Sequence, residues 1–216
     1  MLPDFQDIEK QLTQRFSLSE LEARLRPDDK SGVWTGASEG GFLAPKESLI
    51  DVVRADYETL QRLGLDYEEM ARMADVVVNP PKKETVPRGR WARFMDRLRG
   101  KKQDDLSRGD STFNFLPIGS CGAQGCPWGC SGKDHFGYNT WSGNHTYVVR
   151  KGEFPGVKPG GDFADINRQL YLGSFAVVTG LTPHLIASHY FFEGGDSYRT
   201  DPAKLLEIFN SLQKKR

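Results

Sequence analysis

Apolar residues recur at helical spacing through the first third of the chain. The first helix is predicted from four of them that stand three or four positions apart, namely Phe5, Ile8, Leu12 and Phe16. Ser19, a residue type that caps helices, is expected to start a short second helix. A longer helix is predicted over Glu47–Leu63 because Gly64 is a favourable stop, and Asp66 is expected to cap the next one. The pattern therefore indicates an N-terminal helical segment.

The pattern changes after residue 110. Alternating or β-branched runs predict strands at residues 112–116, 146–150 and 175–179. Thr182-Pro183 resembles a helix start, so residues 184–192 are expected to be helical rather than extended. Asp201-Pro202 repeats this signature before a final amphipathic helix. The predicted fold class is α+β, an N-terminal helical segment followed by a β-rich C-terminal part that a terminal helix closes.

Proline and charged runs suggest where these parts divide. We expect a helical region at residues 1–80, a basic linker at 81–110 and an α+β region at 111–216. The linker contains a short amphipathic helix, Arg88–Arg99, with five arginines around an apolar stripe. Docking of this helix on the protein's own core is favoured over a partner protein, and both are favoured over nucleic acid or an anionic membrane.

Composition and charge narrow the class of protein. The 216 residues include 29 Lys+Arg and 29 Asp+Glu, so no overall field attracts nucleic acid or acidic partners. No apolar run is long enough to cross a membrane, and the first residues lack the pattern of a secretory signal. The three cysteines are odd in number and close together, which is unlike a secreted disulfide framework. A cytoplasmic location is the resulting expectation.

The most unusual chemistry lies between Ser120 and His135. Four potential metal ligands follow one another there, namely Cys121, Cys126, Cys130 and His135. Thiolates and imidazole nitrogens are preferred donors for tetrahedral zinc, and interspersed glycines allow a short backbone to fold around an ion. The sequence therefore predicts a structural zinc site, although the gaps of four and three residues differ from the usual two-residue spacing.

Four other interpretations of this loop remain open. An iron–sulfur cluster also takes thiolates but generally uses four of them. Two of the cysteines could form a disulfide in an oxidising compartment, or one could act as a nucleophile with a nearby histidine as base. The cysteines could also pack as small apolar residues beside Trp128.

The remaining histidines form a possible additional polar site. These residues are His145, His184 and His189. His184 and His189 are five residues apart, which is about 140° around a helix, so they are expected to be poor joint ligands of one ion. The structural interpretation, in which they are satisfied core histidines, is favoured.

Two function classes follow. The order His135, Asn139, Asn144 and His145 resembles that of HNH nucleases, which use histidines to hold a metal and activate water. No helix with the second metal ligand follows at the expected distance. We therefore expect a non-enzymatic binding or interaction protein, with another protein as partner and zinc as its structural ion. A metal- or cysteine-dependent hydrolase of nuclease type is the alternative.

Overall fold

The computed structural model describes residues 1–26, 41–79, 113–119, 124–142, 145–151, 175–195 and 199–213. Its first part contains four helices, namely α1 (Phe5–Leu12), α2 (Leu18–Leu25), α3 (Leu49–Leu63) and α4 (Tyr67–Val78). The second part contains the strands β1 (Phe113–Gly119), β2 (Gln124–Gly125), β3 (Trp141–Ser142), β4 (His145–Lys151) and β5 (Phe175–Thr179), with the helices α8 (Thr182–His189) and α9 (Pro202–Gln213).

Local capping chemistry explains where the first helices begin and end. Asp66 and Glu69 form a capping box at the start of α4, and Gly64 adopts a left-handed conformation with φ 65° at the end of α3, as predicted. The expected cap of α2 was wrong, because Ser17 rather than Ser19 caps this helix. The earlier start brings Leu18 into the helix, where it packs against the core.

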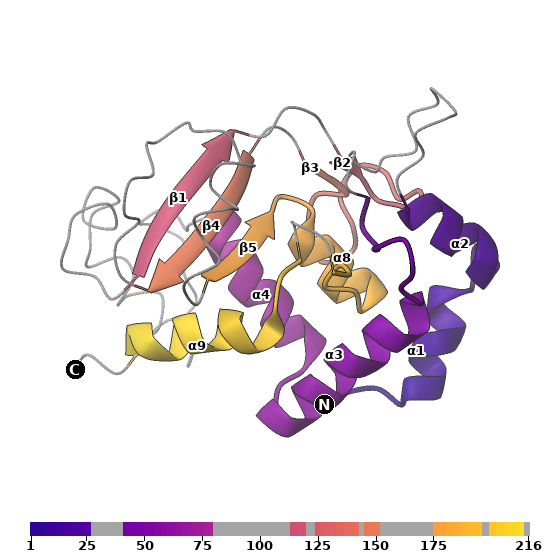
Figure 1. The fold of residues 1–216 in the computed structure, drawn as a ribbon, viewed down its shortest axis with the longest axis horizontal. Coiled ribbons are helices and arrows are strands. Elements are labelled where there is room, and N and C mark those ends of the chain that lie inside the picture. Colours follow the sequence, from indigo (N-terminus) through magenta and orange to yellow (C-terminus); the bar gives the residue numbers. More distant parts are fainter. Residues whose placement is uncertain are drawn as a thin grey trace.

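The main sheet is antiparallel and has the strand order β1–β4–β5. Phe115 pairs with Val149 in one ladder, and Val148 pairs with Val177 in the next. Strands β2 and β3 form a separate two-stranded ribbon. Figure 1 shows α4 and α9 beside the main sheet, while α8 lies between this sheet and α1–α3. Helix α8 therefore contacts both parts of the described structure.

Among the described residues, one hydrophobic cluster joins the two parts. It includes fully buried side chains from α1, α3, β5, α9 and the segment after α8, such as Ile8, Leu60, Val178, Leu205 and Phe191. Burial of this kind contributes roughly 1.5–3 kcal/mol for each large aliphatic or aromatic side chain. The position of α8 is therefore set by packing on both sides.

These elements bear out the mixed α+β class but not every detail of the prediction. The described strands of the second half are few and share it with two helices, so a β-rich C-terminal part is not confirmed. The helix expected over residues 184–192 is present as α8 but ends at His189. The linker predicted at 81–110, and the helix expected over Arg88–Arg99, lie outside the described residues.

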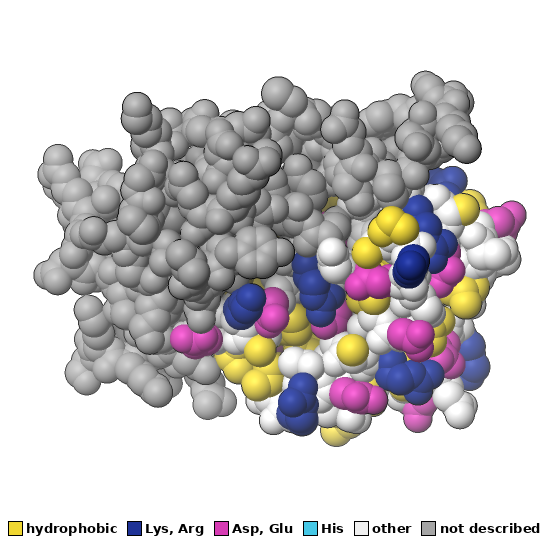
Figure 2. Space-filling view, viewed as in Figure 1, with side chains coloured by type: hydrophobic (Ala, Val, Ile, Leu, Met, Phe, Trp, Pro, Cys, Tyr) yellow, Lys and Arg dark blue, Asp and Glu magenta, His cyan; other side chains and the backbone are white. Residues whose placement is uncertain are grey.

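The described surface carries charges of both signs. Figure 2 shows Lys and Arg side chains interspersed with Asp and Glu side chains over the N-terminal helices. Some of them pair across elements, as Arg54 of α3 does with Glu9 of α1 at 3.0 Å. No helix among the described residues has the length and apolar character that a membrane span requires.

Candidate metal centre

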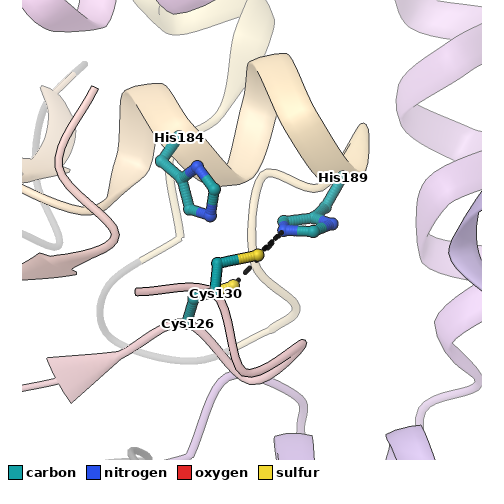
Figure 3. A group of neighbouring side chains, drawn as sticks. All are labelled: Cys126, Cys130, His184 and His189. Carbon is teal, nitrogen blue, oxygen red and sulfur yellow. Dashed lines mark hydrogen bonds between the residues drawn. The ribbon is translucent and has the colours of Figure 1, made fainter. Parts of the chain in front are cut away.

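Two cysteines and two histidines converge between the loop after β2 and helix α8. The four residues are Cys126, Cys130, His184 and His189, and their potential ligand atoms all lie within 4.8 Å of one another. Figure 3 shows the two imidazole rings extending from α8 towards the two sulfur atoms of the loop. Three of the side chains are buried or nearly so, and Cys130 is partly exposed.

A tight turn brings the two cysteines together. The backbone N–H of Gly129 donates to the carbonyl of Cys126 at 2.8 Å, and the N–H of Cys126 donates to the carbonyl of Thr140 at 2.9 Å. Gly129 adopts φ 70°, a conformation that glycine reaches without steric cost. The turn therefore depends on the glycine that separates Trp128 from Cys130.

The N-terminal helices hold this turn in place. Arg15 donates to the carbonyls of Trp128 and of the residue after it, at 2.9 and 3.0 Å. Arg24 donates to the carbonyl of Pro127 at 2.6 Å, and the Trp128 indole N–H donates to the carbonyl of Leu12 at 3.1 Å. Leu12 is the last residue of α1, where carbonyls lack partners within the helix. The cysteine turn and the first two helices thus stabilise each other.

His189 is held between an aromatic ring and the two sulfur atoms. Its ring stacks on Trp128 with a centroid separation of 4.2 Å and an interplanar angle of 7°. Its Nε2 lies 3.3 Å from the Sγ of Cys126 and 3.4 Å from the Sγ of Cys130. Burial lowers the pKa of His189, although Cys130 opposes this effect. The neutral form, which can bind a metal, is therefore favoured.

His184 has one nitrogen bound and the other without a partner. Its Nδ1 lies 2.7 Å from Oδ2 of Asp134, and the side chain is 1% exposed. Burial acts to raise the pKa of Asp134, but hydrogen bonds from His184 and Ser188 hold that pKa below its ordinary value. An ionised carboxylate only accepts hydrogen bonds, so Nδ1 carries a proton, and in the neutral imidazole Nε2 keeps its lone pair. This buried Nε2 makes no hydrogen bond with the described residues.

The two thiols differ in their tendency to ionise. The hydrogen bond between them raises the pKa of Cys126, with burial adding to the effect. The same hydrogen bond lowers the pKa of Cys130, and His189 contributes further. The thiol of Cys130 therefore ionises more readily than the thiol of Cys126. A bound metal would displace any thiol proton, because metal ligation favours the thiolate.

Two of the distances within the cluster fall in the range expected for donors of one tetrahedral ion. Zinc binds thiolates at about 2.3 Å and imidazoles at about 2.0–2.1 Å, so neighbouring donors in a tetrahedron lie roughly 3.3–3.8 Å apart. The two measured S···N separations of 3.3 and 3.4 Å fall at the lower end of this range. A Rieske iron–sulfur cluster also uses two cysteines and two histidines, but there the thiolates bind one iron and the histidines bind the other. Here one histidine nitrogen is next to both sulfurs, which favours a single ion.

The sequence-predicted ligands are only partly brought together. Cys126 and Cys130 belong to the cluster and are free thiols, whereas Cys121 lies outside the described residues. His135 is exposed, and its ring contacts Phe136 at a centroid separation of 3.8 Å. His145 is the first residue of β4, opposite Gly119.

His184 and His189 were expected to be poor joint ligands of one ion, yet the structure places their potential ligand atoms within 4.8 Å of each other. Their rings meet edge to face at a centroid separation of 4.9 Å, although they stand at opposite ends of α8. The argument from helical rotation considered only where the Cα–Cβ bonds point, whereas each imidazole reaches well beyond its Cβ atom. A useful signal was present in the sequence, since a proline-started helix with a histidine near each end can present both to a facing loop.

Comparison with known proteins adds no family to this description. No protein family, curated protein or solved structure matches the chain.

Proposed function

We propose that this protein is a non-enzymatic interaction protein whose fold is stabilised by one zinc ion. The proposed ligands are the thiolates of Cys126 and Cys130 and the Nε2 atoms of His184 and His189. The ion would tie α8 to the cysteine turn, and through that turn to α1 and α2.

The observation that carries this proposal is the unpartnered Nε2 of His184. A buried polar nitrogen without a partner costs about 1–3 kcal/mol. The hydrogen bond from Nδ1 to Asp134 leaves this nitrogen as an acceptor, and it is directed towards two sulfurs and a second imidazole. A cation at the centre of these four donors would satisfy it. A histidine that donates the N–H of one ring nitrogen to a carboxylate and binds metal with the other nitrogen is the usual arrangement in zinc sites.

The donor set favours zinc among the common metals. Two thiolates and two imidazoles suit a borderline-soft ion with tetrahedral geometry, whereas magnesium, calcium and manganese prefer oxygen donors. Four protein donors also complete the shell, which leaves no position for a reacting water. A structural rather than a catalytic ion is therefore the better interpretation.

An interaction role rests on the surface near the centre. The segment that follows the cysteine turn carries Phe136, which is 41% exposed, and Trp141, which is 56% exposed. Large aromatic side chains are enriched where proteins bind each other. We therefore propose another protein as the partner, with the zinc ion holding the adjacent backbone in shape.

Metal analysis of purified, reduced protein tests the zinc site. We expect close to one zinc per chain by elemental analysis. Cys126→Ser and His189→Ala should each lose most of the metal and lower the melting temperature. His135→Ala is the matched control: its side chain is exposed outside the cluster, so it should retain the metal and the stability of the wild type.

The expected loss of stability follows from mass action. A ligand that binds only the folded state at a thousandfold excess over its Kd adds about 4 kcal/mol to the free energy of unfolding. Chelation of the wild type should therefore lower its stability by a comparable amount, and added zinc should restore it. Protein that takes up no zinc, or metal content that is unchanged in both ligand variants, would show that the proposal is wrong.

One observation favours a second candidate, a cysteine-dependent hydrolase. The site contains the acid, base and nucleophile of a cysteine triad in the same spatial order, namely Asp134, His184 and the two sulfurs. In that case iodoacetamide should alkylate Cys130 of the metal-free protein, and the esterase activity should fall in proportion to the alkylation. Added zinc should inhibit the esterase activity. Zinc-dependent stability without esterase activity in either form would leave only the structural site.

A further inference from the structure

Asp134 uses both carboxylate oxygens to connect a surface turn with helix α8. Its Oδ1 accepts the backbone N–H groups of Phe136 and Tyr138, at 3.0 and 2.8 Å. Its Oδ2 accepts the Ser188 hydroxyl at 2.8 Å and the His184 Nδ1–H at 2.7 Å. Four hydrogen bonds therefore fix the plane of one carboxylate.

The turn itself is held independently of α8. The N–H of Asp134 donates to the carbonyl of Tyr138 at 3.0 Å, and the N–H of Gly137 donates to the carbonyl of Asp134 at 3.0 Å. Lys133 and Asn139 form a β-bridge that closes the turn. The turn can therefore present Oδ2 to His184 at a constant position, with little rotation left to the side chain.

We infer that Asp134 is the positioning residue of the zinc site, selecting the His184 tautomer whose Nε2 is free to bind the ion. This inference rests on the zinc site proposed above and assigns to Asp134 a role in metal affinity rather than in folding alone. A neutral histidine carries one proton, on either Nδ1 or Nε2, and only the Nδ1–H form can ligate through Nε2. The carboxylate, which cannot donate, enforces that form.

Asp134→Asn is the sharpest perturbation because it preserves the shape of the side chain. The single amide oxygen is expected to stay with the two backbone N–H groups of the turn. The amide NH₂ group would then face Nδ1 of His184 and donate to it, which moves the imidazole proton to Nε2 and blocks ligation. Loss of an outer-shell partner of a metal ligand typically weakens metal binding 10–100-fold.

Ser188→Ala is the matched control. It removes one hydrogen bond from the same Oδ2 atom but leaves the carboxylate that sets the tautomer. We expect a 10–100-fold increase in the zinc Kd for Asp134→Asn by competition with a chelator, and well under tenfold for Ser188→Ala. Cobalt-loaded Asp134→Asn should also show weaker visible absorption bands, because replacement of an imidazole by water makes the ion less tetrahedral.

A double-mutant cycle separates positioning from a general structural role. If Asp134 acts through His184, Asp134→Asn should cause no further loss of zinc affinity in a His184→Ala background. A purely structural carboxylate would weaken the remaining three-ligand site by the same factor in either background. The wild type gives an independent readout, since ¹⁵N NMR of the zinc-bound protein should show His184 protonated at Nδ1 and metal-bound at Nε2.

The outcomes separate this inference from the proposed function. Wild-type protein that binds no zinc would overturn both. If the wild-type protein binds zinc, the proposed site stands. Three results would then overturn the role of Asp134: equal zinc binding by Asp134→Asn, an effect of this substitution that persists in full without His184, or an NMR spectrum that places the proton on Nε2. The NMR measurement decides the question even if a variant fails to fold.

Discussion

Replacement of Trp128 by phenylalanine tests how strongly the cysteine turn is joined to the first helix. The indole is 2% exposed and donates to the carbonyl of Leu12 at the end of α1. Phenylalanine removes this donor and leaves a buried carbonyl without it, at a cost of about 1–3 kcal/mol. The smaller ring also buries less apolar surface, which costs about 1 kcal/mol more.

The sum of roughly 2–4 kcal/mol corresponds to a fall of about 5–15 °C in Tm for a chain of this length. Zinc content should remain close to that of the wild type, because a phenyl ring can still stack on His189. Unfolding in urea, followed by far-ultraviolet circular dichroism in zinc-saturated protein, measures the change without depending on tryptophan fluorescence.

Trp141→Phe is the control for this experiment. Trp141 is 56% exposed, so its replacement should change the free energy of unfolding by no more than about 0.5 kcal/mol. A Trp128→Phe protein that is as stable as the wild type would refute the reasoning. Equal destabilisation by the two substitutions would do so as well, since it would remove the distinction between the anchored and the exposed indole.

Two further predictions concern the scaffold. Burial raises the pKa of Asp56 to about 6, against the opposing effect of its ion pair with Arg199. The folded state then binds a proton more tightly than the unfolded chain does, so the contribution of Asp56 to stability falls as the pH rises from about 4 to 7, by about 3 kcal/mol. The stability difference between wild type and Asp56→Asn, from denaturation curves at several pH values, should move in favour of the variant by this amount; a pH-independent difference would contradict it. Gly64→Ala should lower the free energy of unfolding by about 1–2 kcal/mol, because the residue is left-handed at φ 65°. This cost comes from the backbone alone, since an added Cβ would meet no atom within 4 Å. Gly64→Asn should cost less in the same denaturation assay, and a stabilised alanine variant would show that this backbone strain is absent.

Much of the secondary structure could be read from the sequence because its causes are local. The apolar stripe before Gly64, the proline after Thr182 and the acidic cap at Asp66 each act within a few residues of the helix end they set. The same local character explains the error at α2. Ser17 and Ser19 can both cap, and the capping box that Ser17 forms with Glu20 favours the earlier one.

The sequence also identified half of the proposed metal centre. Cys126 and Cys130 stand out because thiols are rare, chemically distinctive and placed around a glycine turn. His135 was grouped with them because it follows closely along the chain. Closeness in sequence was misleading there, since the ring of His135 is exposed beside Phe136.

The other half of the centre is a product of the tertiary structure. His189 meets the cysteines from 63 and 59 residues away, and Asp134 meets His184 from 50 residues away. Such contacts depend on how α8 is buried between the sheet and the N-terminal helices, and a single sequence does not record that packing. Amino-acid chemistry by itself determined that thiols and imidazoles were available as ligands. Only the fold decided which of them share a centre, because ligation requires convergence in space, and hydrophobic burial of distant segments sets that convergence.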